Sequence, residues 1–380
     1  MSLAPSNRRP LWRDPILLVL AALIVVALIP LAFLGSRLAR GSGANGAATP
    51  TSVPTQNLLP TSTPTPTATA SPTPTPTPTV VEAPLSGQEV DPQQLLRPPV
   101  VVMIPSDSEQ YGLSQASVVY EARAEYNIPR FMGIFEQLQA EQIGPIRSAR
   151  HYYVQWACPY GPLFVHWGGS PQAYALLAEL NGVCLYELDG QAYEGVYFWR
   201  GYDPVIPWNN GFSSSELLYE YLDGKPLLLR YQGYAHKDDA PPQTRPLTGT
   251  ISLSFIYSVR YTYDPEQNDY LRFYKGGPHV DQLTGEQHRV KNVVVIFVPQ
   301  SKIPGDEKGR LEVETTGSGE ALFFLDGRLM QGRWEKLAPE AEMRFFDASG
   351  KEIAFNRGNI WIEVLGPGDP VDYALGHVPE

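Results

Sequence analysis

An uncharged apolar run near the N-terminus, from Ile16 to Leu34 (ILLVLAALIVVALIPLAFL), most restricts how this chain can fold. A helix needs about 20 apolar residues to cross a bilayer, and it tolerates a proline. Because a cleaved signal peptide has a shorter apolar core of roughly 7–15 residues, we interpret the run as an uncleaved signal anchor. Cleavage within the GANGAAT segment that follows is the alternative. Three arginines precede the run and two follow it, which favours a cytoplasmic N-terminus and an extracytoplasmic remainder.

A stalk is predicted after this anchor. Between Gly41 and Val81 the chain has no charged and no aromatic residue, and much of it is a Thr-Pro repeat. Such a segment cannot bury a core, and its prolines favour an extended conformation. We therefore predict a cytoplasmic tail (residues 1–14), a transmembrane signal anchor (15–35) that crosses the membrane through residues 16–34, and a Thr/Pro-rich disordered stalk (36–84).

The charge of the remaining chain limits its partners. The whole chain has a formal net charge of −11, although its first forty residues carry five arginines and one acid. Nucleic-acid binding needs clustered positive charge, so an acidic exterior argues against that function. A local pocket for an anion remains compatible with this composition.

The sequence after the stalk predicts an α+β protein in two parts. Residues 85–245 are expected to form a layered domain of mixed sheet and helix, with strands at 98–105, 117–125, 130–137 and 162–167. Helices are expected from about Ile146 to Cys158, from the Ser170-Pro171 cap, and from a capping box formed by Ser213 and Glu216.

The second part, residues 246–367, reads as an antiparallel β-rich domain followed by a tail at 368–380. It contains short β-prone runs separated by turn residues, and Asp326-Gly327 between two of them is a strong hairpin signal. The two cysteines, Cys158 and Cys184, are disulfide candidates in an extracytoplasmic domain. Both have apolar neighbours, so two buried free thiols are an equal alternative.

Several motifs occur in an order that resembles a known family. They are RPPVVVMIP, GLSQASVVYEA, RFMGIF, GPIRSAR, VHWGGSPQAY, GSGEALFFLDGRLMQGRW and GNIWIEVL, which together span roughly residues 90 to 366. The chain is similar here to the YerB-like family of bacterial cell-envelope proteins, many of them lipoproteins, with an N-terminal and a C-terminal domain of unknown function. The resemblance implies a layered α+β fold outside the cytoplasm and no established reaction.

The chain departs from that family in two ways. No cysteine lies near the apolar run, so a transmembrane helix and a stalk are expected to replace a lipid anchor. The family pattern also leads us to expect a histidine after the FWR motif, where this chain has IPWNN at residues 206–210. Any role of that histidine is therefore in doubt here.

Two arginines in GPIRSAR, Arg147 and Arg150, are the leading candidates for ligand binding. On the predicted helix they share a face near its N-terminus, where free N–H groups already favour an anion. Guanidinium groups bind phosphate or carboxylate in a forked geometry. The preferred interpretation over a ligand, by a modest margin, is internal pairing with Glu121 and Glu125, which follow one face of the predicted strand at 117–125.

Catalytic candidates are weaker. Glu121 and Glu125, about 6.6–6.8 Å apart by strand rise, suit a general acid and base, but Arg123 between them would keep both ionised. An ordinary solvated or salt-bridged face is therefore the preferred interpretation. His166 precedes a Gly-Gly turn and could do acid–base work, although a histidine beside a tryptophan is more often structural.

Other catalytic signatures are missing from the sequence. His279 and Asp281 have no evident third metal ligand, and there is no HExxH, G-x-S-x-G or P-loop motif. We therefore expect no metal and no cofactor.

Binding of a cell-envelope ligand is the preferred function. We expect an anionic glycan, a wall polymer or a partner protein, held by Arg147 and Arg150 with His166, Ser170 and Arg130 in support. One alternative is a hydrolase or transferase of wall polymers that uses His166 with Glu121 or Glu125. Another is a non-catalytic scaffold for wall-synthesis proteins.

Overall fold

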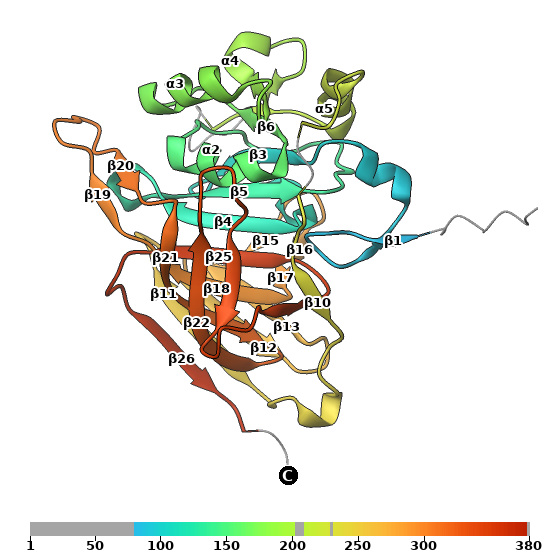
Figure 1. The fold of residues 1–380 in the computed structure, drawn as a ribbon, viewed down its shortest axis with the longest axis vertical. Coiled ribbons are helices and arrows are strands. Elements are labelled where there is room, and N and C mark those ends of the chain that lie inside the picture. The colour runs from blue at the N-terminus through green and yellow to red at the C-terminus, as the bar shows by residue number, and fades with distance from the viewer. Residues whose placement is uncertain (1–79, 202–208, 229–230, 378–380) are drawn as a thin grey trace, which may run out of the picture. The chain divides into compact units, whose positions relative to one another are not determined.

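The computed structural model describes residues 80–201, 209–228 and 231–377 (Figure 1). The predicted cytoplasmic tail, the signal anchor and the stalk up to residue 79 lie outside these ranges. The described residues all belong to one compact unit, Pro74–Glu380. None of the helices in these ranges is both long enough and apolar enough to cross a membrane.

A ten-stranded mixed sheet runs through both predicted domains. Its order is β23 (Arg344–Asp347), β22 (Arg328–Lys336), β21 (Gly317–Leu325), β18 (Asn292–Phe297), β25 (Ile360–Leu365), β4 (Val118–Arg123), β5 (Pro129–Phe135), β3 (Val100–Pro105), β6 (Leu163–His166) and β7 (Tyr186–Asp189). The pair β25–β4, which is parallel, joins the C-terminal five strands to the N-terminal five. The pair β18–β25 is also parallel. The C-terminal part is predicted to be antiparallel, and this pair shows that it is mixed.

A second sheet of six strands is antiparallel throughout. It contains β14 (Gly277–Pro278), β13 (Asp269–Tyr274), β12 (Ser258–Asp264), β11 (Gly249–Ser254) and β26 (Val371–Leu375), and β17 (Arg289–Val290) pairs with β13. Burial alternates along β12 and β13, as expected for strands with one face toward a core. That face packs against the large sheet, where Tyr261 and Tyr270 join a core with Val293 and Trp361. Strand β26 falls in the predicted C-terminal tail, which is therefore partly folded.

The described ranges also contain four short helices, three of which contribute to the core. Helices α2 (His151–Ala157) and α3 (Pro171–Leu180) supply apolar side chains to the core that contains Tyr120 and Ile362, whereas α5 (Ser215–Leu222) contributes to the core shared with the six-stranded sheet. Helix α4 is Gly190–Tyr193. A disulfide joins Cys158 to Cys184 with a Cα–Cα distance of 5.3 Å.

The remaining elements are short. They are β1 (Val81–Glu82), β2 (Glu89–Val90), β8 (Trp199–Arg200), β9 (Gly211–Phe212), β10 (Ala235–Lys237), β15 (Val280–Asp281), β16 (Glu286–Gln287), β19 (Gln300–Lys302), β20 (Leu311–Val313), β24 (Ala354–Asn356) and the 3-10 turns η3 (Pro92–Leu96), η4 (Leu113–Gln115), η5 (Glu125–Asn127), η6 (Cys158–Tyr160) and η7 (Pro242–Thr244). Strand β1 lies within the segment predicted to be stalk, so regular structure begins slightly before residue 85.

Local capping and turn signals had mixed outcomes. Ser170 caps α3 by accepting the Ala173 N–H at 3.1 Å, as predicted. The cap of α5 is Ser214 rather than Ser213, because Ser213 donates its hydroxyl to the Tyr197 carbonyl instead.

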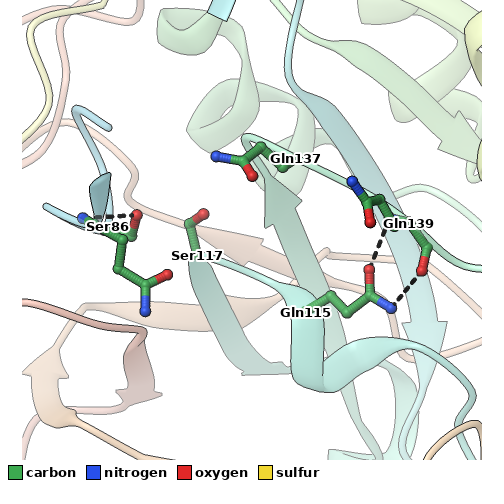
Figure 2. A pocket seen from close by; sticks show the side chains of 6 residues that line it. Ser86, Gln115, Ser117, Gln137 and Gln139 are labelled. Carbon is green, nitrogen blue, oxygen red and sulfur yellow. Dashed lines mark hydrogen bonds between the residues drawn. The ribbon is translucent and has the colours of Figure 1, made fainter. Parts of the chain in front are cut away.

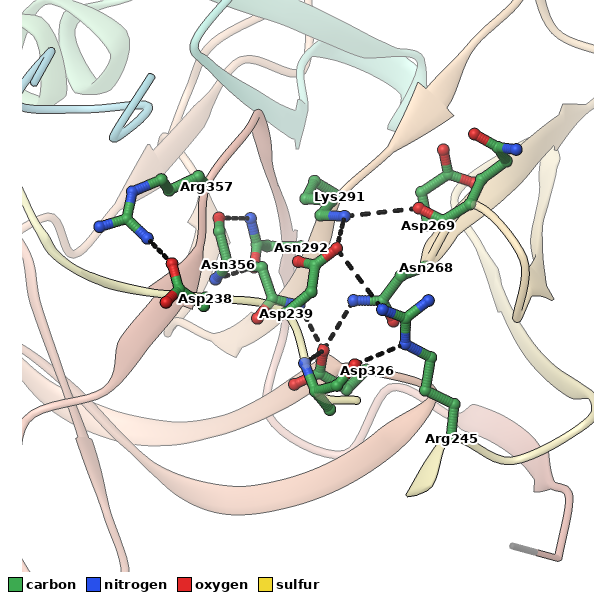
Figure 3. Close-up of polar contacts among 12 residues, drawn as sticks. Asp238, Asp239, Arg245, Asn268, Asp269, Lys291, Asn292, Asp326, Asn356 and Arg357 are labelled. Atoms are coloured by element: carbon green, nitrogen blue, oxygen red, sulfur yellow. Dashed lines mark hydrogen bonds and ion pairs between the residues drawn. The ribbon is translucent and has the colours of Figure 1, made fainter. Parts of the chain in front are cut away.

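The Asp326-Gly327 hairpin turn lies between β21 and β22, as the sequence predicts, and Asp326 has a positive φ of 54°. Its Oδ1 accepts hydrogen bonds from Asn268 Nδ2 at 2.7 Å, Asn356 Nδ2 at 2.9 Å and the Ala240 N–H at 3.1 Å (Figure 3). Nearby, Lys291 Nζ donates to Asp239 at 2.6 Å. The turn is thereby fastened to the loop between β12 and β13, to β24 and to the segment after β10, which gives this polar network a structural role.

Candidate functional site

The negative charge that faces Arg150 is a carboxylate of the protein itself. Arg150 Nε donates to Glu125 Oε1 at 2.5 Å, and Arg130 Nη2 donates to Glu125 Oε2 at 3.0 Å. Arg130 also donates to the Ser148 carbonyl at 2.8 Å. Both arginines are mostly buried. This cluster therefore satisfies two of the predicted ligand-binding residues internally.

Burial and neighbouring charges shift the pKa values of Glu125 and Arg150. Burial alone would raise the pKa of Glu125, but the charges of Arg130 and Arg150 lower it below its usual value. Burial, together with the neighbouring Arg130, lowers the pKa of Arg150 to about 10. Arg150 therefore remains a cation at neutral pH, and Glu125 remains its anion.

Arg147 does not share a helical face with Arg150, contrary to the prediction. Helix α2 begins only at His151, and Arg150 is its N-cap residue in an extended conformation. The backbone of Arg147 pairs with Met103 at 2.8 Å and with Trp167 at 3.0 Å, as in a strand. Its side chain is half-buried and forms no ion pair or hydrogen bond with any residue in the described ranges.

Glu121 lies on a salt-bridged face rather than a solvated one, which is the second of the two possibilities predicted for the strand at 117–125. Strand β4 lies inside the ten-stranded sheet with both faces covered, and Glu121 is 0% exposed. It pairs with Arg272 of β13. Glu125 lies beyond the end of β4, in the 3-10 turn η5, so the two carboxylates occupy different clusters.

His166 and Ser170 have structural partners. His166 is fully buried, with Nδ1 2.9 Å from the Gly168 carbonyl and Nε2 3.2 Å from a Glu187 carboxylate oxygen. Ser170 is occupied as the cap of α3. His166 and the acids Glu121 and Glu125 are thus not assembled into a catalytic group.

The His279 and Asp281 pair is also enclosed. His279 lies between Arg272 and Gln110, and Asp281 accepts backbone N–H groups from Gly112, Ser114 and Leu283. Within the described part of the chain, no group of three or more His, Cys, Asp or Glu side chains is placed to hold a metal ion.

A hollow lined only by serine and glutamine is the strongest candidate site. It has a volume of about 330 Å³ and is lined by Ser86, Gln88, Gln115, Ser117, Gln137 and Gln139. Their side chains surround a common space (Figure 2). The residues come from the β1–β2 hairpin, from η4 and the start of β4, and from the loop after β5. None of the sequence-predicted ligand-binding residues lines it.

A second hollow continues from the first, because the two share Gln137 and Gln139. It has a volume of about 270 Å³ and is lined by Gln93, Gln94, Arg97, Glu136, Gln137, Leu138, Gln139 and Tyr219. The Arg97 guanidinium lies 4.8 Å from the centre of the Tyr219 ring. We call the two hollows together the glutamine groove.

Backbone-directed hydrogen bonds hold the walls of the glutamine groove. Gln115 and Gln139 are joined reciprocally: Gln115 Nε2 donates to the Gln139 carbonyl and Gln115 Oε1 accepts the Gln139 N–H, both at 2.8 Å. Buried Glu136 accepts the N–H groups of Leu85 at 2.9 Å and Ser86 at 3.1 Å, which fixes the β1–β2 hairpin against the end of β5. Burial raises the pKa of Glu136, although these N–H groups oppose the shift.

Other side chains of the glutamine groove are free to meet a ligand. The amides of Gln88 and Gln137 and the hydroxyl of Ser117 have no hydrogen-bond partner within the ranges that the structure describes. An amide offers two N–H donors and a carbonyl acceptor, and a hydroxyl both donates and accepts. The first hollow therefore suits an uncharged ligand that carries many donors and acceptors.

Sequence reasoning missed the glutamine groove because no single motif encodes it. Its residues are spread over SGQ, DPQQLLR, GLSQAS, EQLQ and Tyr219 of α5, segments that only the fold brings together. The available signal was the recurrence of glutamine in the turns that bracket β3, β4 and β5. Such turns carry binding residues on rigid scaffolds.

Comparisons with known proteins extend across most of the described chain. Residues 85–228 match the N-terminal domain, and residues 251–362 the C-terminal domain, of DUF3048, a protein family of unknown function. YerB of Bacillus subtilis (strain 168), which its name classes as a lipoprotein, is 28% identical over 316 residues, or 78% of this chain and 89% of that protein. The crystal structure of YerB from Bacillus subtilis matches with a TM-score of 0.68 at 26% identity, covering 77% of this chain and 99% of that one. The resemblance expected from the motifs is confirmed.

Proposed function

This chain belongs to the DUF3048 family, and we propose that it is a membrane-held extracytoplasmic protein that binds an uncharged glycan of the cell envelope in its glutamine groove. The observation that carries the proposal is the lining of the first hollow, which consists of serines and glutamines alone. Sugar hydroxyls both donate and accept, and so do these side chains. Ordered amides such as Gln115 reduce the entropy that binding would otherwise cost.

The second hollow supports the same class of ligand. Tyr219 is half-buried beside it, and its hydroxyl accepts the Leu138 N–H at 2.9 Å, which fixes the ring. An aromatic ring with a polar tip packs well against the apolar face of a sugar. Because the two hollows share a wall, a chain of linked sugars could occupy both.

An anionic ligand gains less support from the site than the sequence suggested. Arg130 and Arg150 both pair with Glu125, so they already have a partner within the protein. Arg97 is the one cation that lines the glutamine groove among the described residues, and it lies over Tyr219. A wall hydrolase that uses His166 would need that residue to reach a substrate, yet His166 is buried.

Attachment to the membrane is proposed from the sequence and from the relative. YerB is classed by its name as a lipoprotein, which implies a membrane surface. In the present chain we propose that the apolar run from Ile16 to Leu34 serves as the anchor and that the Thr-Pro segment acts as a spacer. The glutamine groove would then be presented to the envelope outside the membrane.

The proposal is tested with the full chain in detergent and oligosaccharides of N-acetylglucosamine as the probe. We expect saturable binding by calorimetry, and a loss of about tenfold or more in the double variant Gln88→Ala/Gln137→Ala. Two lost hydrogen bonds at about 1 kcal/mol each justify that factor. Gln331→Ala, an exposed glutamine on β22, is the matched control and should bind like the wild type.

Three results would contradict this proposal. Unchanged affinity in the double variant would remove the glutamine groove from the binding site. Release of soluble fragments from wall material by the wild type would replace binding with hydrolysis. If no uncharged oligosaccharide binds and the protein retains an envelope protein instead, the alternative function of a non-catalytic scaffold would be favoured.

A further inference from the structure

Two glutamates lie side by side in the middle of the ten-stranded sheet. Glu121 of β4 and Glu363 of β25 are directly paired in register across parallel strands. Neighbouring strands are about 4.8 Å apart, so their side chains are adjacent on one face. Both side chains are 0% exposed. We propose that Glu121 and Glu363 form a proton-binding site that holds one shared proton in the folded protein.

One cation serves both carboxylates. Arg272 of β13 pairs with Glu121 through Nη2, and the same nitrogen lies 3.6 Å from Glu363 Oε1. Its Nε donates to the Tyr261 hydroxyl at 3.0 Å, and Tyr261 donates its own proton to Glu363. Two ionised glutamates against one guanidinium would leave a net negative charge with no access to water. Proteins avoid an uncompensated buried charge by shifting its pKa.

Each glutamate also has one oxygen without a partner. Glu121 Oε1 and Glu363 Oε2 are both buried and receive no hydrogen bond within the described ranges, whereas the other oxygen of each residue is engaged. With a single proton between the two carboxyl groups, the protonated group donates a hydrogen bond and the ionised group accepts it. The shared proton thus satisfies both orphaned atoms and neutralises the excess charge.

The histidines near Arg272 do not supply a second cation. Arg272 Nη1 donates to His279 Nδ1 at 2.5 Å, so this nitrogen carries no proton and His279 donates through Nε2 to Gln110 Oε1 at 2.8 Å. His288 packs against His279 with ring centroids 4.4 Å apart, and burial lowers the pKa of His288 to about 4. Both histidines are therefore neutral at pH 7.

The other ionisable groups near the pair do not change this balance. Asp281 is held by the three backbone N–H groups described above, and its charge acts on His288. Tyr274 of β13 lies near Glu121, with burial raising its pKa far above neutrality. Burial raises the pKa of Tyr153 of α2, and the charge of Glu121 raises it further. Tyr153 is therefore neutral as well.

The expected pH dependence follows from the direction of the shift. Burial raises the pKa of Glu121, the negative charge of Glu363 raises it further, and Arg272 opposes the change. The folded state therefore keeps a proton that the unfolded chain releases above about pH 4.3. Stability is full below that pH and is lost as the pH rises through the raised value. Because β4 and β25 belong to the two family domains, loss of the proton loosens the strand pair that joins them.

The test compares the unfolding of the full chain in detergent with that of Glu363→Gln, at pH values from about 5 to 8. The amide keeps the shape of the carboxyl group and donates to Glu121 without a titrating proton. We expect the ratio of the two unfolding constants to change about tenfold per pH unit, with the wild type losing stability relative to the variant. Glu320→Gln, an exposed glutamate of β21 in the same sheet, should follow the wild type.

A second measurement does not depend on how the variant folds. The infrared spectrum of the wild type at neutral pH should contain the carbonyl band of an un-ionised carboxylic acid. That band should be missing from Glu363→Gln and from Glu121→Gln. A constant ratio of unfolding constants across the pH range would overturn the proposal, and so would a wild-type spectrum without the acid band.

Discussion

At the scale of single residues, the internal pairing predicted for the two GPIRSAR arginines holds for Arg150 and not for Arg147 among the described residues, and only one of the two predicted acids is a partner. Glu125 does pair with Arg150, whereas Glu121 faces Arg272 on the six-stranded sheet. The alternation rule failed because β4 ends at Arg123. Tyr126 and Asn127 then adopt positive φ values of 57° and 59°. This turn places Glu125 away from the face that Glu121 occupies. The residue types in the segment do not predict the turn.

Removing the charge of Glu125 tests the cluster. Glu125→Gln leaves Arg130 and Arg150 buried without an anion, so we expect a loss of about 3 kcal/mol in the free energy of unfolding, measured by urea denaturation at pH 7. The neighbouring arginines lower the pKa of Glu125. Its contribution is therefore present above the ordinary glutamate pKa and is lost as the pH falls through the lowered value. Glu314→Gln, which is exposed, should change little; equal stability of the two variants would contradict the role of Glu125.

At the scale of elements, local signals succeeded where the interactions that form the element are local. The Ser170-Pro171 start of α3 and the Asp326-Gly327 hairpin were readable because cap and turn chemistry depend on adjacent residues. The helix expected from Ile146 begins later because residues 146–149 are strand-like. Ile146 N–H donates to Gly211 at 2.7 Å and Ala149 N–H to Gly168 at 2.9 Å. Such partners are invisible to a local reading.

The disulfide gives a test at this scale. Cys158 follows α2 and Cys184 follows α3, with 26 residues of sequence separation. Closing a loop of this size stabilises the fold by about 3 kcal/mol in the chain-entropy model. We expect Cys158→Ala/Cys184→Ala to lose that amount in guanidinium denaturation. A reductant should destabilise the wild type equally and leave the double variant unchanged, and a reductant effect on both proteins would contradict the prediction.

At the scale of the whole molecule, the sequence predicted both sets of strands but not their union. SVVYEA and NIWIEVL each read as a strand, and the register that places Ile362 beside Tyr120 unites them in one sheet. The sequence of neither segment predicts that the other is its pairing partner, because the packing of both faces decides how distant strands pair. The division at residues 245 and 246 remains a prediction about domains, and the shared sheet shows that it is not a division between separate sheets.

Separating the halves tests this union. Residues 80–245 expressed alone should fail to reach the native state, because β4 would expose its edge and lose β25 as a neighbour. Limited proteolysis and near-ultraviolet circular dichroism would measure this failure. Addition of residues 246–377 should restore protection if the two halves reassemble. A native-like spectrum for the isolated first half would contradict the prediction.

The pairing of β4 with β25 also determines when the molecule can acquire its structure. A ribosome delivers Ile360 long after Val118, so the central strands wait for a late partner. Contacts between distant segments form slowly, and the edges left open meanwhile are prone to aggregation. A chain of this design is expected to depend on assistance from folding factors while its last strands are still being made.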